Sequence, residues 1–159
     1  MLEDIDIKRK DAKFKLRVSG IIIKDNKILV HKAKKFDGYC FPGGHVKLKE
    51  TTKESIVREI KEEVGIDVLI EDILCIDENI YCSNGVTSQE INYYFYLKVL
   101  SNIETREFNK EEFDNGVIKI HEFIWIPIEE YSKFTIMPSH VADLIINKVS
   151  NKILLTDNR

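Results

Sequence analysis

Long apolar runs are missing from this sequence of 159 residues. No stretch approaches the ~20 apolar residues that a membrane-spanning helix needs. The first ten residues, MLEDIDIKRK, are charged throughout and contain no apolar segment of the kind found in a secretion signal. Net positive charge is missing too: the formal charge is -3, so no overall positive field attracts a long nucleic acid. We therefore expect no membrane partner and no long nucleic acid partner.

Paired cysteines are also missing. The three cysteines, Cys40, Cys75 and Cys82, are odd in number and lack the spacing of a metal site, so we expect reduced thiols and a cytoplasmic location. The sequence has no internal repeat and no low-complexity linker. With 32% charged and 43% hydrophobic residues, its composition is typical of a globular protein, and its length predicts one domain over 1–159. The oligomeric state is left open, with a homodimer as one option.

Alternation of apolar residues and turn signals predict several strands. Residues 13–24 and 27–34 are expected to form a hairpin around Asp25-Asn26. Two further strands are expected from Ile66 and from Val86, separated by the turn Ser83-Asn84-Gly85, and another over 120–128. Residues 101–119 are polar and are predicted to form a loop.

Two helices complete the predicted elements. Ser139 is expected to cap a helix in which Val141, Leu144, Ile145 and Val149 share one face. The other helix is expected from Thr52 to Val64, because Thr51 and Glu54 have the form of a capping box and Gly65 suits a left-handed helix end. Strands interleaved with two helices predict an α/β (α+β) class with a mixed sheet covered by helices.

Three carboxylates form one stripe on the helix that follows Thr51. Glu59, Glu62 and Glu63 stand at positions i, i+3 and i+4, where like charges destabilise a helix by a few tenths of a kcal/mol per pair. A hard divalent cation such as Mg²⁺ would be the missing counter-charge. Without that cation, Glu59→Gln is expected to be neutral or stabilising. Three glutamates at such spacing more often form a plain solvated helix face. The flanking residues therefore decide between a metal site and a solvated face.

The flanking residues carry a specific motif. Residues Gly44 to Ile66 read GHVKLKETTKESIVREIKEEVGI, which resembles the Nudix box, G-x5-E-x7-R-E-U-x-E-E-x-G-U with U aliphatic. All nine fixed positions are filled, by Gly44, Glu50, Arg58, Glu59, Ile60, Glu62, Glu63, Gly65 and Ile66. The preceding Phe41-Pro42-Gly43 resembles the usual entry into the box. The resemblance implies a Nudix-like fold, a mixed β-sheet sandwiched between helices.

The resemblance also implies a function and a site. It implies a divalent-metal-dependent hydrolase that cleaves a diphosphate bond in a nucleotide or in a nucleoside diphosphate linked to another group. Mg²⁺ or Mn²⁺ is expected to be bound by Glu59, Glu62, Glu63 and the backbone carbonyl of Gly44. Arg58 is expected to pair with Glu50 in the catalytic site, the alternative being a surface pair with Glu54.

The residue that removes a proton from water is left open by the sequence. Glu62 and Glu63 are the first candidates for this base. A further base or ligand is sought among Glu90, Glu111, Glu112 and Glu122, for which ordinary solvated charge is the alternative.

Clues to the substrate are few. The candidate substrate-binding residues are Glu90, Glu122, Tyr39 and Tyr81. Phosphate contacts are considered for His31, Lys32, Lys34 and Lys35, and base stacking for Phe36, Tyr39, Tyr81 and Tyr94, with a solvated strand end and core packing as the respective alternatives. The proline that ADP-ribose-cleaving relatives carry about sixteen residues after the box is replaced by Cys82.

Two other functions compete with hydrolysis. A non-catalytic Nudix module that senses a nucleotide would not need the box glutamates, all of which are intact. An isomerase of the isopentenyl diphosphate type would need a cysteine in a Cys-Cys-Ser-His-Pro setting, whereas Cys40 lies in Tyr-Cys-Phe-Pro. A plain α/β domain with an acidic helix is the alternative outside the family.

Overall fold

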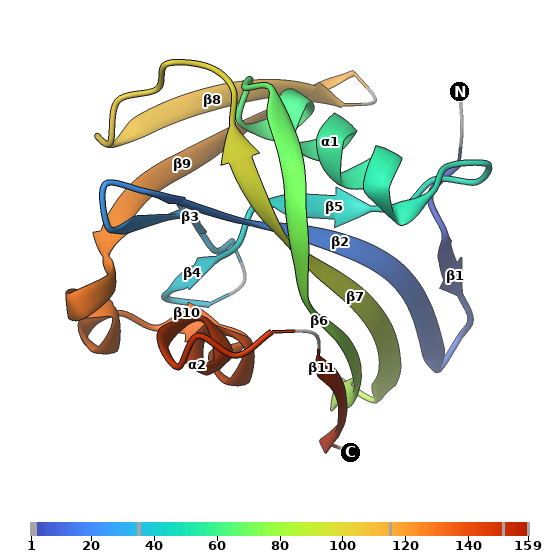
Figure 1. Ribbon diagram of the computed structural model, residues 1–159. Helices are drawn as coiled ribbons and strands as arrows, with labels where there is room; N and C mark the ends of the chain where they lie inside the picture. Colours follow the sequence, from blue (N-terminus) through green and yellow to red (C-terminus); the bar gives the residue numbers. More distant parts are fainter. Residues whose placement is uncertain (1–2, 35, 115, 151, 159) are drawn as a thin grey trace.

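A computed structural model describes residues 3–34, 36–114, 116–150 and 152–158 (Figure 1). The strands are β1 (Asp6–Lys8), β2 (Ala12–Lys24), β3 (Lys27–Lys32), β4 (Tyr39–Cys40), β5 (Gly43–His45), β6 (Val68–Ser83), β7 (Val86–Val99), β8 (Phe108–Asp114), β9 (Val117–Pro127), β10 (Ile136–Met137) and β11 (Lys152–Asn158). The helices are α1 (Thr52–Glu63), the 3-10 helix η1 (Ile128–Lys133) and α2 (Ser139–Ile146). Within these residues, no helix is long and apolar enough to cross a membrane.

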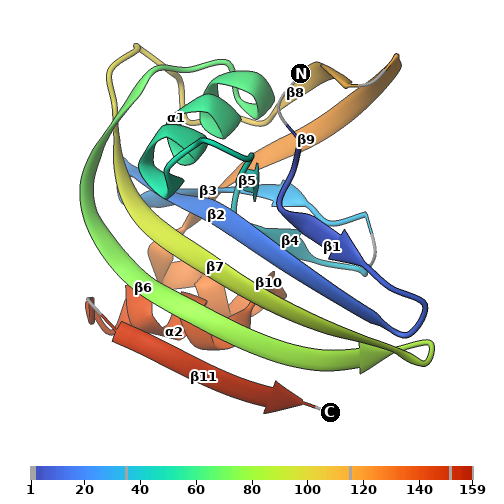
Figure 2. The same cartoon turned by 90° about the vertical axis from the view of Figure 1, so that its right-hand side faces the viewer.

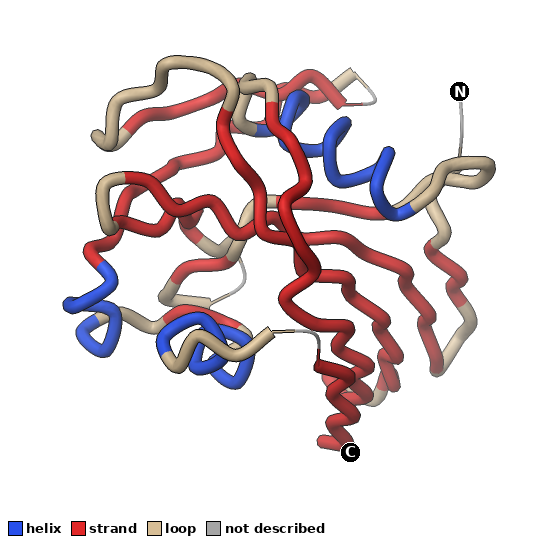
Figure 3. Tube along the Cα trace, in the orientation of Figure 1, coloured by secondary structure: helices blue, strands red, loops and turns tan. Residues whose placement is uncertain are grey.

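Strand β2 connects two groups of strands (Figure 2). It pairs in parallel with β7 over Ala12–Ile22, and β7 continues to β6 and the edge strand β11. At its end it pairs with β3 only through Ile23 and Lys24, and β3 continues to β4 and β9. The group that contains β7, β6 and β11 and the group that contains β4 and β9 are therefore joined at the β2–β3 turn and separate away from it (Figure 3).

Both predicted hairpin turns are confirmed. Asp25 and Asn26 have φ values of 51° and 56°, and Asn84 and Gly85 have values of 52° and 74°. Two successive residues with positive φ give a turn whose twist matches that of the flanking strands, which is why asparagine, aspartate and glycine are favoured there. The turns set the register, so that Lys24 pairs with Lys27 and Ser83 with Val86.

The helix α1 forms where the sequence predicts it. The hydroxyl of Thr51 accepts a hydrogen bond from the Glu54 N–H at 3.2 Å, and the Glu54 carboxylate accepts one from the Thr51 N–H at 2.8 Å. Gly65 ends the helix at φ +83°. Ile56 and Ile60 are completely buried beneath α1, each contributing roughly 1.5–3 kcal/mol.

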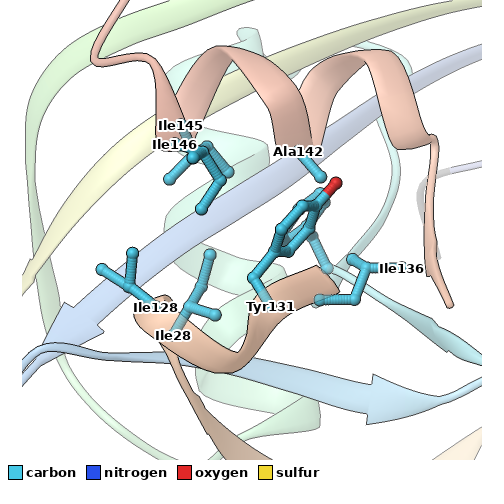
Figure 4. Close-up of a pocket in the computed structure, with 8 residues that line it drawn as sticks. Ile28, Ile128, Tyr131, Ile136, Ala142, Ile145 and Ile146 are labelled. Carbon is cyan, nitrogen blue, oxygen red and sulfur yellow. The ribbon is translucent and has the colours of Figure 1, made fainter. Parts of the chain in front are cut away.

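The alternation of strand residues divides the core between the two faces of the sheet. Val18 and Ile22 of β2 face α1 together with other apolar residues, among them Phe95, Leu97 and Phe123. Ile21 faces α2, in a second core that includes Phe41, Tyr94, Val141 and Ile145. The mixed sheet lies between two helices, which confirms the predicted fold class. Figure 4 shows a small apolar cavity of the second core, between Ile28, η1 and α2.

The predicted loop over residues 101–119 is wrong in part. Strand β8 occupies Phe108–Asp114 and pairs with β9, which itself starts at Val117 rather than Ile120. The segment FNKEEFD shows little apolar alternation because β8 is an outer strand, which among the described residues pairs with β9 alone. Its anchor is Phe108, whose ring stacks on Phe123 at 5.0 Å, a contact that local sequence does not reveal.

The second helix also differs from its prediction. Its N-cap is Pro138, Ser139 is its first helical residue, and no side chain caps it. The helix ends at Ile146, so Val149 lies beyond it, after Lys148 has turned to a φ of 53°. The short strands β4 and β10 and the edge strand β11 were not predicted. The parallel pairing of β10 with β4 and of β11 with β6 joins segments that lie far apart in the sequence.

Candidate active site

The guanidinium of Arg58 organises the acidic face of α1. Its Nε donates to Oε1 of Glu50 at 2.6 Å and its Nη2 to Oε2 of Glu50 at 2.9 Å, a two-pronged geometry that fits a carboxylate. Its Nη2 also donates to the carbonyl of His45 at 3.0 Å. Arg58 thus ties α1 to the segment before it. Glu54 belongs instead to the capping box of Thr51.

Arg58 also neutralises part of the carboxylate stripe. Its Nη1 donates to Glu59 at 2.7 Å and to Glu62 at 2.9 Å. The hydrogen bond from Arg58 holds the pKa of Glu50 down to about 2, against the cost of its burial. Burial alone would lower the pKa of Arg58, but its hydrogen bond to Glu50 and the charge of Glu59 raise it. Glu50 and Arg58 are therefore both charged at neutral pH.

Glu59 is buried against the glycine that opens the box. Only 8% of Glu59 is exposed. A Cβ atom added at Gly44 would overlap all three terminal atoms of the Glu59 carboxyl group, so a side chain there would displace this carboxylate. The close approach places the backbone of Gly44 next to a carboxylate, as a shared metal site would require.

Glu63 is held by the residue before Gly44. Its Oε2 accepts a hydrogen bond from the backbone N–H of Gly43 at 2.9 Å, and its Oε1 lies 3.9 Å from Nδ1 of His121. Glu63 is 8% exposed, whereas the side chain of Glu62 keeps 41% of its surface in solvent. The three glutamates therefore differ in exposure: Glu59 and Glu63 are buried near Gly44 and Gly43, and Glu62 is partly open to solvent.

The three carboxylates do not converge in their present rotamers. Across the part of the chain that the structure describes, no three histidine, cysteine or acidic side chains are arranged to hold a metal ion. Arg58 explains this, because its Nη1 already bridges Glu59 and Glu62. The positively charged guanidinium of Arg58 therefore lies between the carboxylates of Glu59 and Glu62.

A pocket of about 580 Å³ lies beside this cluster. Its floor is formed by β2, β7 and β6. Its walls come from β3 with residues that follow it, from β4, and from Met137 of β10 with Pro138. Two residues that line the pocket lie close to residues that contact Glu63. Phe41 lines the pocket two residues before Gly43, and His31 lines it with its ring 6.1 Å from that of His121. A ligand in the pocket would thus extend toward Glu63.

Comparisons with known proteins agree with this fold and with the box motif. A model of the NUDIX domain matches residues 13–145. The chain belongs to this family. An 8-oxo-dGTP diphosphatase from Buchnera aphidicola subsp. Schizaphis graminum is 32% identical over 128 residues, which cover 78% of this chain and 87% of that protein.

Two further likenesses agree with this assignment. An ADP-ribose pyrophosphatase from Methanocaldococcus jannaschii is 50% identical over 60 residues, which cover 36% of this chain and 36% of that protein. This match therefore spans only about a third of the relative's length. The crystal structure of a MutT protein from Bacillus halodurans superposes with a TM-score of 0.67 at 16% identity, covering 89% of this chain and 88% of that chain. The last comparison supports the Nudix fold alone.

The structure separates the other predicted site residues into two groups. Those that line the pocket are His31, Lys34, Phe36, Tyr81, Glu90 and Tyr94. Tyr39 does not line it: its ring packs against Phe134 at 6.0 Å and lies under Lys32. Glu122 on β9 and Glu111 on β8 are exposed. Lys35 and the side chain of Glu112 lie outside the described residues.

Four residues in or near the candidate site were not predicted from the sequence. His121 approaches Glu63, and Arg17, Ser19 and Asn92 lie on the pocket floor. The alternation of each strand was visible in the sequence, but the pairing of β2 with β7 was not. Only that pairing brings Arg17 and Asn92 together.

Proposed function

We propose that this Nudix protein is a divalent-metal-dependent hydrolase that cleaves the diphosphate bond of a nucleoside diphosphate derivative. The observation that carries this proposal is the complete box cluster together with a nearby pocket large enough for a nucleoside, whose lining residue Ser19 pairs with Gly43, the residue that donates to Glu63. The named relatives, a pyrophosphatase and a diphosphatase, support the same class of bond. Their different substrates leave the rest of the substrate open.

The residues fit a hard divalent ion. Carboxylate and carbonyl oxygens are the ligands that Mg²⁺ and Mn²⁺ prefer. Glu59, Glu62, Glu63 and the carbonyl of Gly44 would hold the ion. The absence of a Cβ at Gly44 leaves room for the Glu59 carboxylate against the backbone. Because Arg58 now contacts two of these carboxylates, binding requires its Nη1 to release at least one, while its grip on Glu50 is kept.

The chain's own groups have separate tasks in the reaction. Glu50 and Arg58 fix the segment 43–45 against α1, so that the carboxylates keep their positions. A bound divalent metal supplies charge neutralisation on the diphosphate and a lower pKa for water. Glu62, which is open to solvent, and Glu63, which is held by Gly43, are the two groups to which we assign removal of the proton from the attacking water. The products would be a nucleoside monophosphate and a second phosphorylated fragment.

A substrate panel tests the proposal. The purified protein is incubated with Mg²⁺ or Mn²⁺ and with nucleoside triphosphates, nucleotide sugars, ADP-ribose and dinucleoside polyphosphates, and the products are identified. We expect a nucleoside monophosphate from at least one compound, and no product in excess chelator. Glu63→Gln should abolish it, while Glu71→Gln, an exposed carboxylate of β6 away from the site, should not. Binding of a nucleotide without turnover of any compound would favour the sensor function instead.

A further inference from the structure

His121 occupies a core position on β9. The side chains at positions 121, 123 and 125 are buried in turn along this strand, and Phe123 and Trp125 belong to the apolar core that includes the buried face of α1. His121 is buried like them, with 8% of its surface exposed, whereas the neighbouring Glu122 is exposed. Burying a polar ring costs stability unless the ring serves a polar group nearby. His121 is therefore expected to have a polar partner in this part of the core.

Aromatic contacts hold the imidazole of His121 in place. Its ring stacks on that of Phe123, with 6.2 Å between the ring centroids and 24° between the ring planes. It also meets the ring of His31 edge to face, with the centroids 6.1 Å apart. Phe123 is itself stacked on Phe108 at 5.0 Å. These contacts limit rotation of the imidazole, so that its Nδ1 keeps one direction.

The Nδ1 atom of His121 faces the carboxylate of Glu63. Oε2 of Glu63 accepts a hydrogen bond from the N–H of Gly43 at 2.9 Å, and Oε1 lies 3.9 Å from Nδ1. The latter distance exceeds the length of about 2.7–3.2 Å that an N–H···O hydrogen bond has. The last torsion of a glutamate side chain has a broad energy well, so a modest rotation of the carboxylate closes this gap at little cost.

The task of Glu63 requires one orientation of its carboxylate. In the proposed function, Glu63 binds the divalent metal and is a candidate for removing the proton from water. The hydrogen bond from Gly43 holds one carboxylate oxygen but still allows the other to swing about it. A misplacement of about 1 Å at a reacting group costs about 100-fold in rate. A donor on the side of Oε1 removes this freedom, and Nδ1 of His121 lies on that side.

We infer that His121 is a positioning residue of the hydrolase: its Nδ1–H donates to Oε1 of Glu63 and fixes the carboxylate for metal binding and proton removal. His121 acts through Glu63 and is assigned no contact with the substrate. The inference rests on the proposed function for the reaction that Glu63 serves. It differs from a purely structural role, in which the ring of His121 only fills space beside Phe123.

Three substitutions at position 121 separate the donor from the ring. His121→Asn carries an amide nitrogen where Nδ1 stands, His121→Gln carries one where Nε2 stands, and His121→Phe keeps a ring without a donor. We expect kcat to fall about 100-fold in His121→Phe and His121→Gln with little change in KM, and to recover about 10-fold in His121→Asn. Thermal melts should give another order, with His121→Phe above His121→Asn, because the phenyl ring keeps the stacking on Phe123. A purely structural role predicts that kcat follows the melting temperature, and that result would overturn the inference.

Mn²⁺ binding measures the same effect without turnover. Electron paramagnetic resonance of free Mn²⁺ gives a dissociation constant for each protein. We expect His121→Phe to bind Mn²⁺ about 10-fold more weakly than the wild type, as loss of a partner that orients a metal ligand does, and His121→Asn to stay close to the wild type. Ile120→Asn changes the next position of β9, where the side chain is 54% exposed, and should leave the affinity unchanged. Equal affinities of His121→Phe and the wild type, or of His121→Phe and His121→Asn, would overturn the inference.

Nuclear magnetic resonance of the wild-type chain decides even where a variant fails to fold. Long-range ¹H–¹⁵N spectra of the imidazole of His121 at neutral pH show which ring nitrogens carry a proton. We expect a proton on Nδ1, and an Nδ1 without a proton would overturn the inference. Absence of product from every compound of the substrate panel would contradict the proposed hydrolase function alone, because the Mn²⁺ affinities and the ring spectra still decide whether His121 orients Glu63.

Discussion

Arg58 and Glu50 are joined by two hydrogen bonds of 2.6 and 2.9 Å across the turn that leads into α1. The pair lies eight positions apart in sequence, so it closes the segment around Glu50 onto the helix that carries the carboxylates. Its side chains are only 21% and 10% exposed, which limits screening by solvent. This pair holds the segment before α1 against the helix that carries the proposed metal ligands.

Replacing Arg58 should destabilise the fold. Arg58→Met leaves Glu50 half-enclosed without its partner, and an uncompensated charge of this kind costs about 3 kcal/mol. Arg58→Lys cannot reproduce the two-pronged contact and should recover only part of that loss. Denaturant unfolding of the three proteins measures the effect. A change below about 0.5 kcal/mol for Arg58→Met would show that the pair is an ordinary surface contact.

Acid should remove the contribution of Glu50 in a defined range. The pKa of Glu50 in the folded protein is about 2, below its ordinary value of 4.5, because Arg58 donates to the charged form. The resulting stability is present above pH 4.5 and is lost as the pH falls toward 2, by up to about 3 kcal/mol. Unfolding free energies between pH 6 and pH 2.5 should fall less steeply for Glu50→Gln than for the wild type. Parallel curves would contradict the assignment.

The sequence predicted the box helix well because its signals are local. The capping box at Thr51, the apolar positions Ile56 and Ile60 and the helix end at Gly65 all lie within one helix length. The pairing of Arg58 with Glu50 was also expected. Its simultaneous bonds to Glu59 and Glu62 were not, because spacing along a helix gives the face of a residue but not which partner its side chain selects.

Other parts of the molecule depend on pairing between distant segments. Strand β8 has a polar sequence and is fixed by β9, and the pocket floor exists because β2 lies parallel to β7. Apolar periodicity shows that a strand exists, but it does not show which strand is its neighbour. For this reason Glu90 and Tyr81 were candidates only by residue type, and Arg17, Asn92 and His121 were not candidates at all.

The expected effect of Glu59→Gln is reversed by the structure. Glu59, Glu62 and Glu63 were expected to repel one another without a metal, but Arg58 donates to Glu59 at 2.7 Å and also to Glu62. Losing a hydrogen bond to a charged group costs about 1.5 kcal/mol, so Glu59→Gln should now be destabilising in chelator. Thermal melts in chelator should therefore give a lower melting temperature for Glu59→Gln than for the wild type.

A metal titration extends that comparison. Added Mg²⁺ or Mn²⁺ at about 100 times its dissociation constant should stabilise the wild type by up to about 2.7 kcal/mol, and the variant by much less. Glu71→Gln serves as the control for loss of an exposed carboxylate. If Glu59→Gln is as stable as the wild type in chelator, the contact with Arg58 contributes nothing to the metal-free fold. An equal response of both proteins to metal would argue against Glu59 as a ligand.

A side chain at Gly44 should displace the Glu59 carboxylate. Gly44→Ala would place a methyl group inside the Glu59 carboxyl group and push it away from the backbone. We expect turnover to fall about 100-fold through misplacement of the site, with a smaller effect on folding because Glu59 can move outward. Steady-state kinetics and a thermal melt of the same sample separate the two effects. Unchanged turnover in Gly44→Ala would contradict the close packing on which the site depends.

Hydrolysis in ¹⁸O-labelled water is the most direct measurement of the central claim. The protein is given Mg²⁺ and the substrate that the panel identifies, and the products are analysed by mass spectrometry. The account predicts one ¹⁸O atom in a phosphate group of one product, formed only when the divalent metal is present and absent in Glu63→Gln. Label on a sugar carbon, or undiminished turnover in excess chelator, would contradict it.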